Sequence, residues 1–200
     1  LMMTNWETCL QPSFAACELA WSVLRPTLQP VKPPEVIQLL GIYDTWRKDD
    51  MDWDWNRQVL PFQVAMAAEW SIQLIVDMIE GDADYDDMIA AGLSMLQFER
   101  QQMKQAITGG ARFYDMWHVA GLEKVVAINA SFNPGRLADL VWEMYPDAKA
   151  MVQYYRTADA KWKYSLRSPE GGHDCSKAAK YFRGGGHFHA AGFVWRDLLF

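Results

Sequence analysis

Cysteine is scarce in this chain of 200 residues. Its three cysteines, Cys9, Cys17 and Cys175, are too few and too scattered for a disulfide framework or a zinc knuckle. No apolar run approaches the roughly 20 residues that cross a membrane, and no basic and apolar leader opens the sequence. We therefore expect a cytoplasmic chain with no membrane partner.

Hydrophobic residues are abundant by contrast, at 50% of the sequence, so the chain can bury a sizeable core as one domain or two small ones. Its ten Trp, nine Phe and eight Tyr are assigned mainly to core packing. Charge is distributed unevenly. Residues 149–200 hold nine Lys and Arg against four acids, a net charge of +5, which leaves −11 on the other 148 residues. A basic segment beside an acidic one favours a phosphate-binding module next to a metal-holding or merely solvated one.

Hydrophobic periodicity predicts helices in the first half of the chain. We expect them over 13–24, with Ser13 as N-cap, and over 34–45, 63–79 and 85–107, with an acidic turn at 48–55. The acids at 82–87 lack the glycine and the bidentate Glu of a calcium loop and are better explained as a helix N-terminus.

The pattern changes after residue 108. We expect strands over 111–119 and 124–129, a helix opened by Asn133 and Pro134, a hairpin of 150–156 with 162–167, a helix over 176–182 and a last strand over 191–195. The predicted fold class is therefore α/β of the α+β type, with an acidic helical part followed by a small mixed sheet.

A glycine run near the end of the chain carries the strongest chemical signal. Gly184, Gly185 and Gly186 precede His187. Glycines allow main-chain N–H groups to converge on an anionic oxygen, and a histidine adds a group that titrates near neutral pH. The local pattern predicts a loop that handles phosphate.

The string WKYSLRS…DCSKAAKYFRGGGHFHAAGF, from Trp162 to Phe193, closely resembles the C-terminal substrate-binding domain of the DHH phosphoesterases, which hydrolyse phosphodiesters with divalent metal. The family usually has a further glycine where Arg183 stands. The resemblance implies three parts: the end of a metal-binding domain (1–60), a helical linker (61–108) and a substrate-binding domain (109–200), with the active site in the cleft between the two domains.

The resemblance also implies roles for single residues. Arg167 and His187 are expected to hold the phosphate and stabilise charge during catalysis. Further substrate contacts are expected from the SLRS element and the glycine loop, namely Ser165, Ser168, Gly184, Gly185, Gly186 and His189. Without the resemblance, Arg167 would read as a solvated charge.

Asp44, in the segment LLGIYDTWR, is expected to be a ligand of Mn²⁺ or Mg²⁺, because residues 13–21 resemble the helix that follows the family's Asp-His-His triplet. No such triplet occurs here, and the first histidine is His118. One aspartate cannot hold two metal ions, so these residues alone are expected to be catalytically incomplete. Trp46, Trp53 and Trp55 could stack on bases, although packing is the simpler interpretation.

The sequence thus predicts a metal-dependent phosphodiesterase, dinuclear when complete. Its expected substrates are short oligonucleotides (RNA or single-stranded DNA), linear or cyclic dinucleotides, or a mononucleotide bisphosphate, and a homodimer is left open. A binding module for nucleotides or RNA without hydrolysis is the alternative, because similar domains also accompany alanyl-tRNA synthetases.

Overall fold

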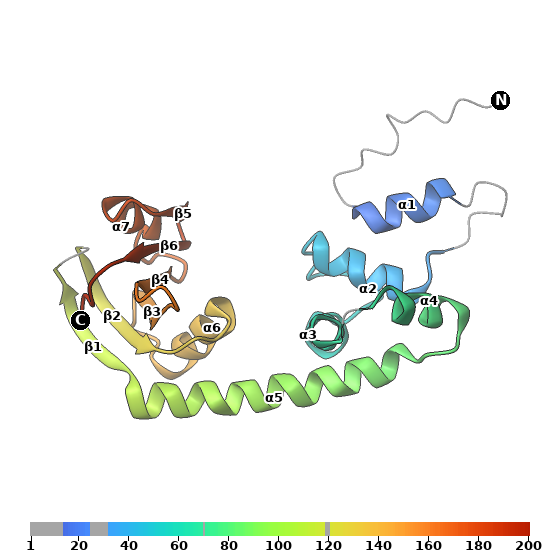
Figure 1. The fold of residues 1–200 in the computed structure, drawn as a ribbon, viewed down its shortest axis with the longest axis horizontal. Helices are drawn as coiled ribbons and strands as arrows, with labels where there is room; N and C mark the ends of the chain where they lie inside the picture. Colours follow the sequence, from blue (N-terminus) through green and yellow to red (C-terminus); the bar gives the residue numbers. More distant parts are fainter. Residues whose placement is uncertain (1–13, 25–31, 70, 119–120) are drawn as a thin grey trace. The chain divides into compact units, whose positions relative to one another are not determined.

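The computed structural model describes residues 14–24, 32–69, 71–118 and 121–200. The chain divides into two compact units, Leu1–Phe98 and Glu99–Phe200. The first unit is helical and the second contains a six-stranded mixed sheet, which confirms the predicted α+β class (Figure 1). No helix among the described residues is both long enough and apolar enough to cross a membrane. The three-part division at residues 60 and 108 stays a prediction.

The helices of the first unit pack around one apolar core. Its most deeply buried members include Leu39, Val59, Phe62 and Met66, all fully or almost fully shielded from solvent. The elements are α1 (Ala16–Leu24), α2 (Glu35–Asp44), the π-helical turn η2 (Trp55–Val59), α3 (Leu60–Ala68), α4 (Ile72–Glu80) and α5 (Tyr85–Gly110), which continues into the second unit.

The helix expected over 34–45 is confirmed as α2, but the one expected over 63–79 is two helices. Ser71 is the N-cap of α4, and its hydroxyl accepts a hydrogen bond from the N–H of Gln73. This cap starts a new helix inside a stretch whose apolar periodicity is continuous. The turn expected to reach residue 55 stops at Asp54, whose carboxylate caps η2. The proposed cap Ser13 lies outside the described residues.

The second unit is built on a sheet of strand order β1-β2-β3-β4-β6-β5. Only β2 and β3 pair in parallel, with α6 as their crossover, and the other neighbours are antiparallel. The elements are β1 (Arg112–Trp117), β2 (Leu122–Asn129), α6 (Pro134–Met144), β3 (Ala150–Arg156), β4 (Trp162–Arg167), α7 (Cys175–Tyr181), β5 (Gly185–His187) and β6 (Ala190–Trp195).

Alternate residues of the strands enter two different cores. Val152, Tyr164 and Phe193 belong to the core that includes α7 residues, and Ile128 and Met151 belong to the core that includes α6 and the end of α5. Successive side chains of a strand point to opposite faces, so α6 and α7 cover opposite sides of the sheet. On the α6 side the buried residues come from β2, β3 and Ser165 of β4, while the other positions of β4, β6 and β5 are half-buried or exposed.

Two expectations need correction in this unit. The segment 184–187 was predicted as a loop, but Gly185 to His187 form a short edge strand that pairs with β6 across a two-residue turn. The helix expected to end at 107 continues through Gly109 and Gly110, where a β-carbon would meet no atom within 4 Å. The first strand, expected to reach residue 119, ends at Trp117, and residues 119 and 120 are not described.

Candidate phosphate-binding site

Arg167 and His187, the two predicted phosphate ligands, lie in one row of the sheet. Arg167 in β4 pairs with Ala190 in β6, and Ala190 pairs with His187 in β5. Directly paired residues of adjacent strands project from the same face. The two side chains therefore start from one face, two strand spacings or about 10 Å apart.

In the adjacent row Ser165 is buried, and the row opens to solvent toward β5. Ser165 in β4 pairs with Gly192 in β6, and Gly192 pairs with Gly185 in β5. Two neighbouring positions of this row therefore lack a side chain. A β-carbon at Gly185 would meet no atom within 4 Å, so the main chain there is open to an approaching molecule.

The charge of this face favours an anion. Three rows on this side, two of them running from β3 to β5 and one from β3 to β6, contain Arg167, His187 and Lys163 and no acidic residue. No carboxylate forms an ion pair with Arg167 among the residues that the structure describes. We call this surface the phosphate face; its members in β4, β5 and β6 are Lys163, Ser165, Arg167, Gly185, His187, Ala190, Gly192 and Val194.

Arg167 is half-buried, and its Nη1 donates a hydrogen bond of 2.8 Å to the carbonyl of Leu166. Burial lowers the pKa of its guanidinium from the usual value, although the group stays protonated at neutral pH. A buried cation without a carboxylate is costly. An anionic ligand would remove that cost, which is a physical reason to expect one.

The three glycines before His187 differ in their hydrogen bonds and in the space around them. The N–H of Gly184 donates to the carbonyl of Ala179 at 2.8 Å, so it is already used. Gly186 has φ of +138°, and a β-carbon there would come within 2.5 Å of the Ala190 oxygen. Because β5 pairs on one side only, alternate N–H groups point away from the sheet edge. Substrate contact by Gly184 stays a prediction, and the edge of β5 offers further main-chain donors.

Arg183 occupies a left-handed backbone position, with φ of +60°. This is the position where the resembling family usually has glycine. Its N–H donates to the carbonyl of Lys180 at 3.0 Å, as the chain leaves α7. A non-glycine residue is strained in this region, so the loop keeps its turn at an energetic cost.

Ser168 and His189 are hydrogen-bonded to each other at the end of β4. The Ser168 hydroxyl lies 3.1 Å from Nδ1 of His189, and the Ser168 N–H donates to the His189 carbonyl at 3.2 Å. The N–H of Cys175 donates to the Phe188 carbonyl at 2.7 Å. These bonds tie the end of β4 and the start of α7 to the turn after His187. Direct substrate contact by Ser168 or His189 stays a prediction.

Gln153 was not singled out from the sequence, yet it lies directly opposite Ser165 in the sheet. It is 1% exposed. Its Nε2 donates to the Phe132 carbonyl at 3.1 Å, but its Oε1 has no hydrogen-bond partner within the described part of the chain. A buried carbonyl without a donor is unusual. The signal in the sequence was a single amide in a mostly apolar strand.

Asp44, in the first unit, is the last residue of α2 and is exposed. The turn after it is fixed by the buried Glu18, which accepts hydrogen bonds from Arg47 at 2.6 Å and from the N–H of Ala15 at 2.8 Å. Gly41 makes room for this carboxylate, since a β-carbon there would lie 2.4 Å from Cδ of Glu18. The end of α2 is thus held by an ion pair shielded from water.

A dinuclear metal centre does not fit the described residues on their own. They contain no group of three or more His, Cys, Asp or Glu side chains placed to hold a metal ion. Asp44 would supply one carboxylate of the four to six ligands that each such ion requires. The role of Asp44 as a metal ligand stays a prediction, and it needs ligands from beyond these residues.

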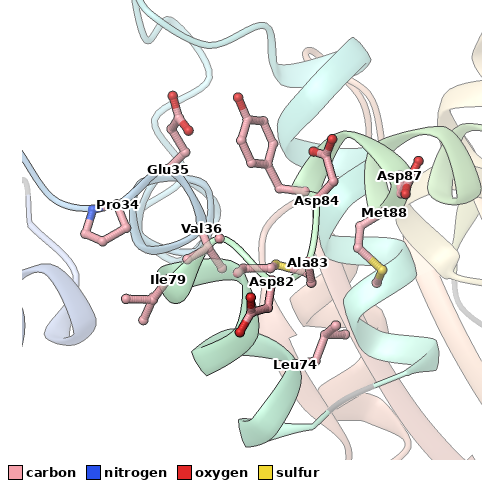
Figure 2. A pocket seen from close by; sticks show the side chains of 13 residues that line it. Pro34, Glu35, Val36, Leu74, Ile79, Asp82, Ala83, Asp84, Asp87 and Met88 are labelled. Carbon is pink, nitrogen blue, oxygen red and sulfur yellow. The ribbon is translucent and has the colours of Figure 1, made fainter.

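A hollow lies in the first unit, with a volume of about 750 Å³. Figure 2 shows the carboxylates of Glu35, Asp82, Asp84 and Asp87 around it, with apolar side chains such as Met88 between them. Burial and Glu35 raise the pKa of the adjoining Tyr85. Asp84 accepts the N–H of Asp86 at 2.8 Å, which is the helix-start role predicted for this acidic run. The negative charge makes this hollow unsuited to a phosphate.

Comparison with known proteins gives matches among solved structures only. No family model and no curated protein matches the chain. A pGpG-specific phosphodiesterase, PggH of Vibrio cholerae, matches with a TM-score of 0.51 and 11% identity over 88% of this chain and 66% of its own. The chain shares the fold of a phosphodiesterase. An exopolyphosphatase-related protein of Bacteroides fragilis matches at a TM-score of 0.40 and 18% identity, over 62% of this chain and 37% of its own.

The shared fold agrees with the α+β architecture that the resemblance implied. The chain spans slightly less than two thirds of the length of PggH and a smaller share of the Bacteroides protein. At this level of identity the match carries no information about single residues. The function is therefore inferred from the phosphate face itself.

Proposed function

We propose that this chain binds the phosphodiester of a short oligonucleotide or dinucleotide on the phosphate face. Divalent metal, with Asp44 as one of its ligands, would supply the hydrolytic chemistry, although the described residues do not form such a centre on their own. Arg167 would grip non-bridging oxygens with its planar guanidinium, and His187 would contact the same or the adjacent phosphate. A protein that binds and hydrolyses its ligand in this way would be a phosphodiesterase.

One observation carries this proposal: the sheet register places a half-buried, carboxylate-free Arg167, the exposed His187 and the bare main chain at Gly185 on one face. A fully exposed surface arginine would keep its hydration shell, whereas the guanidinium of Arg167 is partly desolvated. Both the desolvation of Arg167 and the absence of an acid from the rows of this face make an anion the complementary ligand.

A second candidate is a nucleotide-binding module without hydrolysis. It is favoured by the lack, among the described residues, of any cluster of three metal-ligating side chains. The two candidates make the same prediction for binding and opposite predictions for turnover. The homodimer that the sequence left open is part of neither.

Binding is tested with a fluorescently labelled RNA dinucleotide, by anisotropy in the presence of a chelator. Arg167→Ala should weaken binding at least tenfold, because each charge-assisted bidentate contact contributes about 1.5–3 kcal/mol. His187→Ala should weaken it severalfold. Lys180→Ala is the matched control, since Lys180 is an exposed cation on α7, over the opposite face, and its loss should change affinity less than twofold.

Turnover is then measured with the same dinucleotide and added Mn²⁺. Cleavage that Arg167→Ala abolishes would favour the hydrolase, and binding without cleavage would favour the module. Equal affinities of wild type, Arg167→Ala and Lys180→Ala would overturn both candidates.

A further inference from the structure

The turn after Asp44 carries an exposed aromatic cluster that the phosphate face does not explain. Trp46 is 58% exposed, although its indole is among the largest apolar side chains. Its ring packs edge-on against Trp55, with centroids 4.9 Å apart, and against Tyr43 at 5.9 Å. Tyr43 and Trp55 in turn stack on each other at 5.6 Å, with only 8° between their planes.

The tryptophans considered from the sequence are thus separated by the structure. Trp53 is buried in the core of the first unit, and its Nε1 donates to Gln38. Trp55 is half-buried against the same core. Trp46 does not belong to that core, so packing explains Trp53 and most of Trp55 but leaves Trp46 unexplained.

The backbone is bent to present this ring. Trp46 has φ of +58°, in the left-handed region that bulky residues avoid. The turn is held by the Trp46 N–H to the Tyr43 carbonyl at 3.2 Å and by the Lys48 N–H to the Trp46 carbonyl at 2.9 Å. Backbone strain and the exposure of an apolar ring to water both cost free energy, so we expect Trp46 to have a function that offsets this cost.

A cation lies over the exposed ring. Nζ of Lys48 is 4.7 Å from the centroid of Trp46 and 5.5 Å from that of Trp55. Lys48 forms no ion pair with an acid in the part of the chain that the structure describes. An aromatic ring held at a fixed angle, with an ammonium group over one face, suits a planar base that carries a phosphate.

We propose that Trp46, supported by Tyr43 and Trp55, is a stacking surface for a nucleobase, with Lys48 placed to meet the phosphate of the same nucleotide. This inference rests on the proposed function, because it assigns a base-binding subsite to the same class of ligand. It adds that the chain recognises the base as well as the phosphodiester.

The test compares two ligands in the same anisotropy assay: the labelled RNA dinucleotide and its abasic counterpart, which keeps the sugar and phosphates. Trp46→Ala should weaken dinucleotide binding about tenfold, the effect typical of one lost base–aromatic stack, and should leave the abasic ligand within twofold. Trp46→Phe should retain most of the affinity. Phe98→Ala, which removes an aromatic ring that is 64% exposed on α5, is the control and should change neither affinity.

Each outcome separates the two proposals. If Arg167→Ala weakens both ligands while Trp46→Ala weakens neither, or both equally, the stacking surface is overturned and the phosphate face stands. If Trp46→Ala acts as expected and Arg167→Ala changes nothing, the phosphate face falls instead. A wild type that binds neither ligand overturns both. A ring that serves only to pack against protein would give Trp46→Phe and Trp46→Ala variants of lowered stability and unchanged preference for the base.

Discussion

Arg183 is a non-glycine residue in a turn whose backbone conformation favours glycine. Its φ of +60° is left-handed, and the α7 end that it closes positions the glycines of β5. Arg183→Gly should stabilise the protein by about 0.5–1 kcal/mol, because glycine adopts this conformation without the β-carbon clash. Urea unfolding followed by circular dichroism measures the change.

Arg183→Ala is the control for that substitution. It removes the same charge and keeps the β-carbon, so it should show no comparable gain. An equal gain from both variants would mean that charge, and not backbone conformation, sets the cost at this position.

The contacts of single residues were also the feature least predictable from the sequence. It selected Arg167, Ser165 and His187 through a resemblance, and the register then placed them on one face. It could not find Gln153, because the unpartnered Oε1 depends on which residues of distant strands become neighbours. The bond that occupies the Gly184 amide was equally invisible, since it follows from how α7 ends.

At the scale of elements, glycine contacts decide how closely helices pack. A β-carbon at Gly92 in α5 would come within 1.9 Å of the Pro61 carbonyl oxygen in α3. Gly92→Ala should therefore cost about 2 kcal/mol despite the better helix propensity of alanine, because the atom it meets is backbone and cannot turn aside. The free energy of unfolding in urea is the measurement.

The same helix offers an opposite case. Gly109 in α5 has nothing within 4 Å of its virtual β-carbon, so Gly109→Ala should stabilise by about 0.5–1 kcal/mol through propensity alone. Destabilisation by both variants would show that α5 tolerates no added methyl group anywhere, and that the contact with Pro61 is not the cause.

Elements with strong local signals were the ones that the sequence predicted well. Asn133 followed by Pro134 marks the start of α6, and the alternation over 150–167 marks the β3–β4 hairpin. The break between α3 and α4 was missed, because apolar spacing continues across it and only the Ser71 cap records it. The β5 strand was missed too, since glycines carry no pattern of alternation.

At the scale of the whole molecule, the apolar cores divide with the chain. One core draws its buried members from residues 36–89, and the other two draw theirs from residues 103–193. Among the described residues no buried side chain is shared between the two sets, and cooperativity in unfolding depends on shared packing. We therefore expect two transitions in urea instead of one.

The variants argued above assign these transitions. Gly92→Ala lies in the first unit and should lower the urea midpoint of one transition only, whereas Arg183→Gly lies in the second and should raise the midpoint of the other. A dinucleotide that binds the phosphate face should raise the midpoint of the Arg183-sensitive transition, because a ligand stabilises what it binds by mass action. A single transition that both substitutions shift would mean that the two units unfold as one cooperative body despite their separate cores.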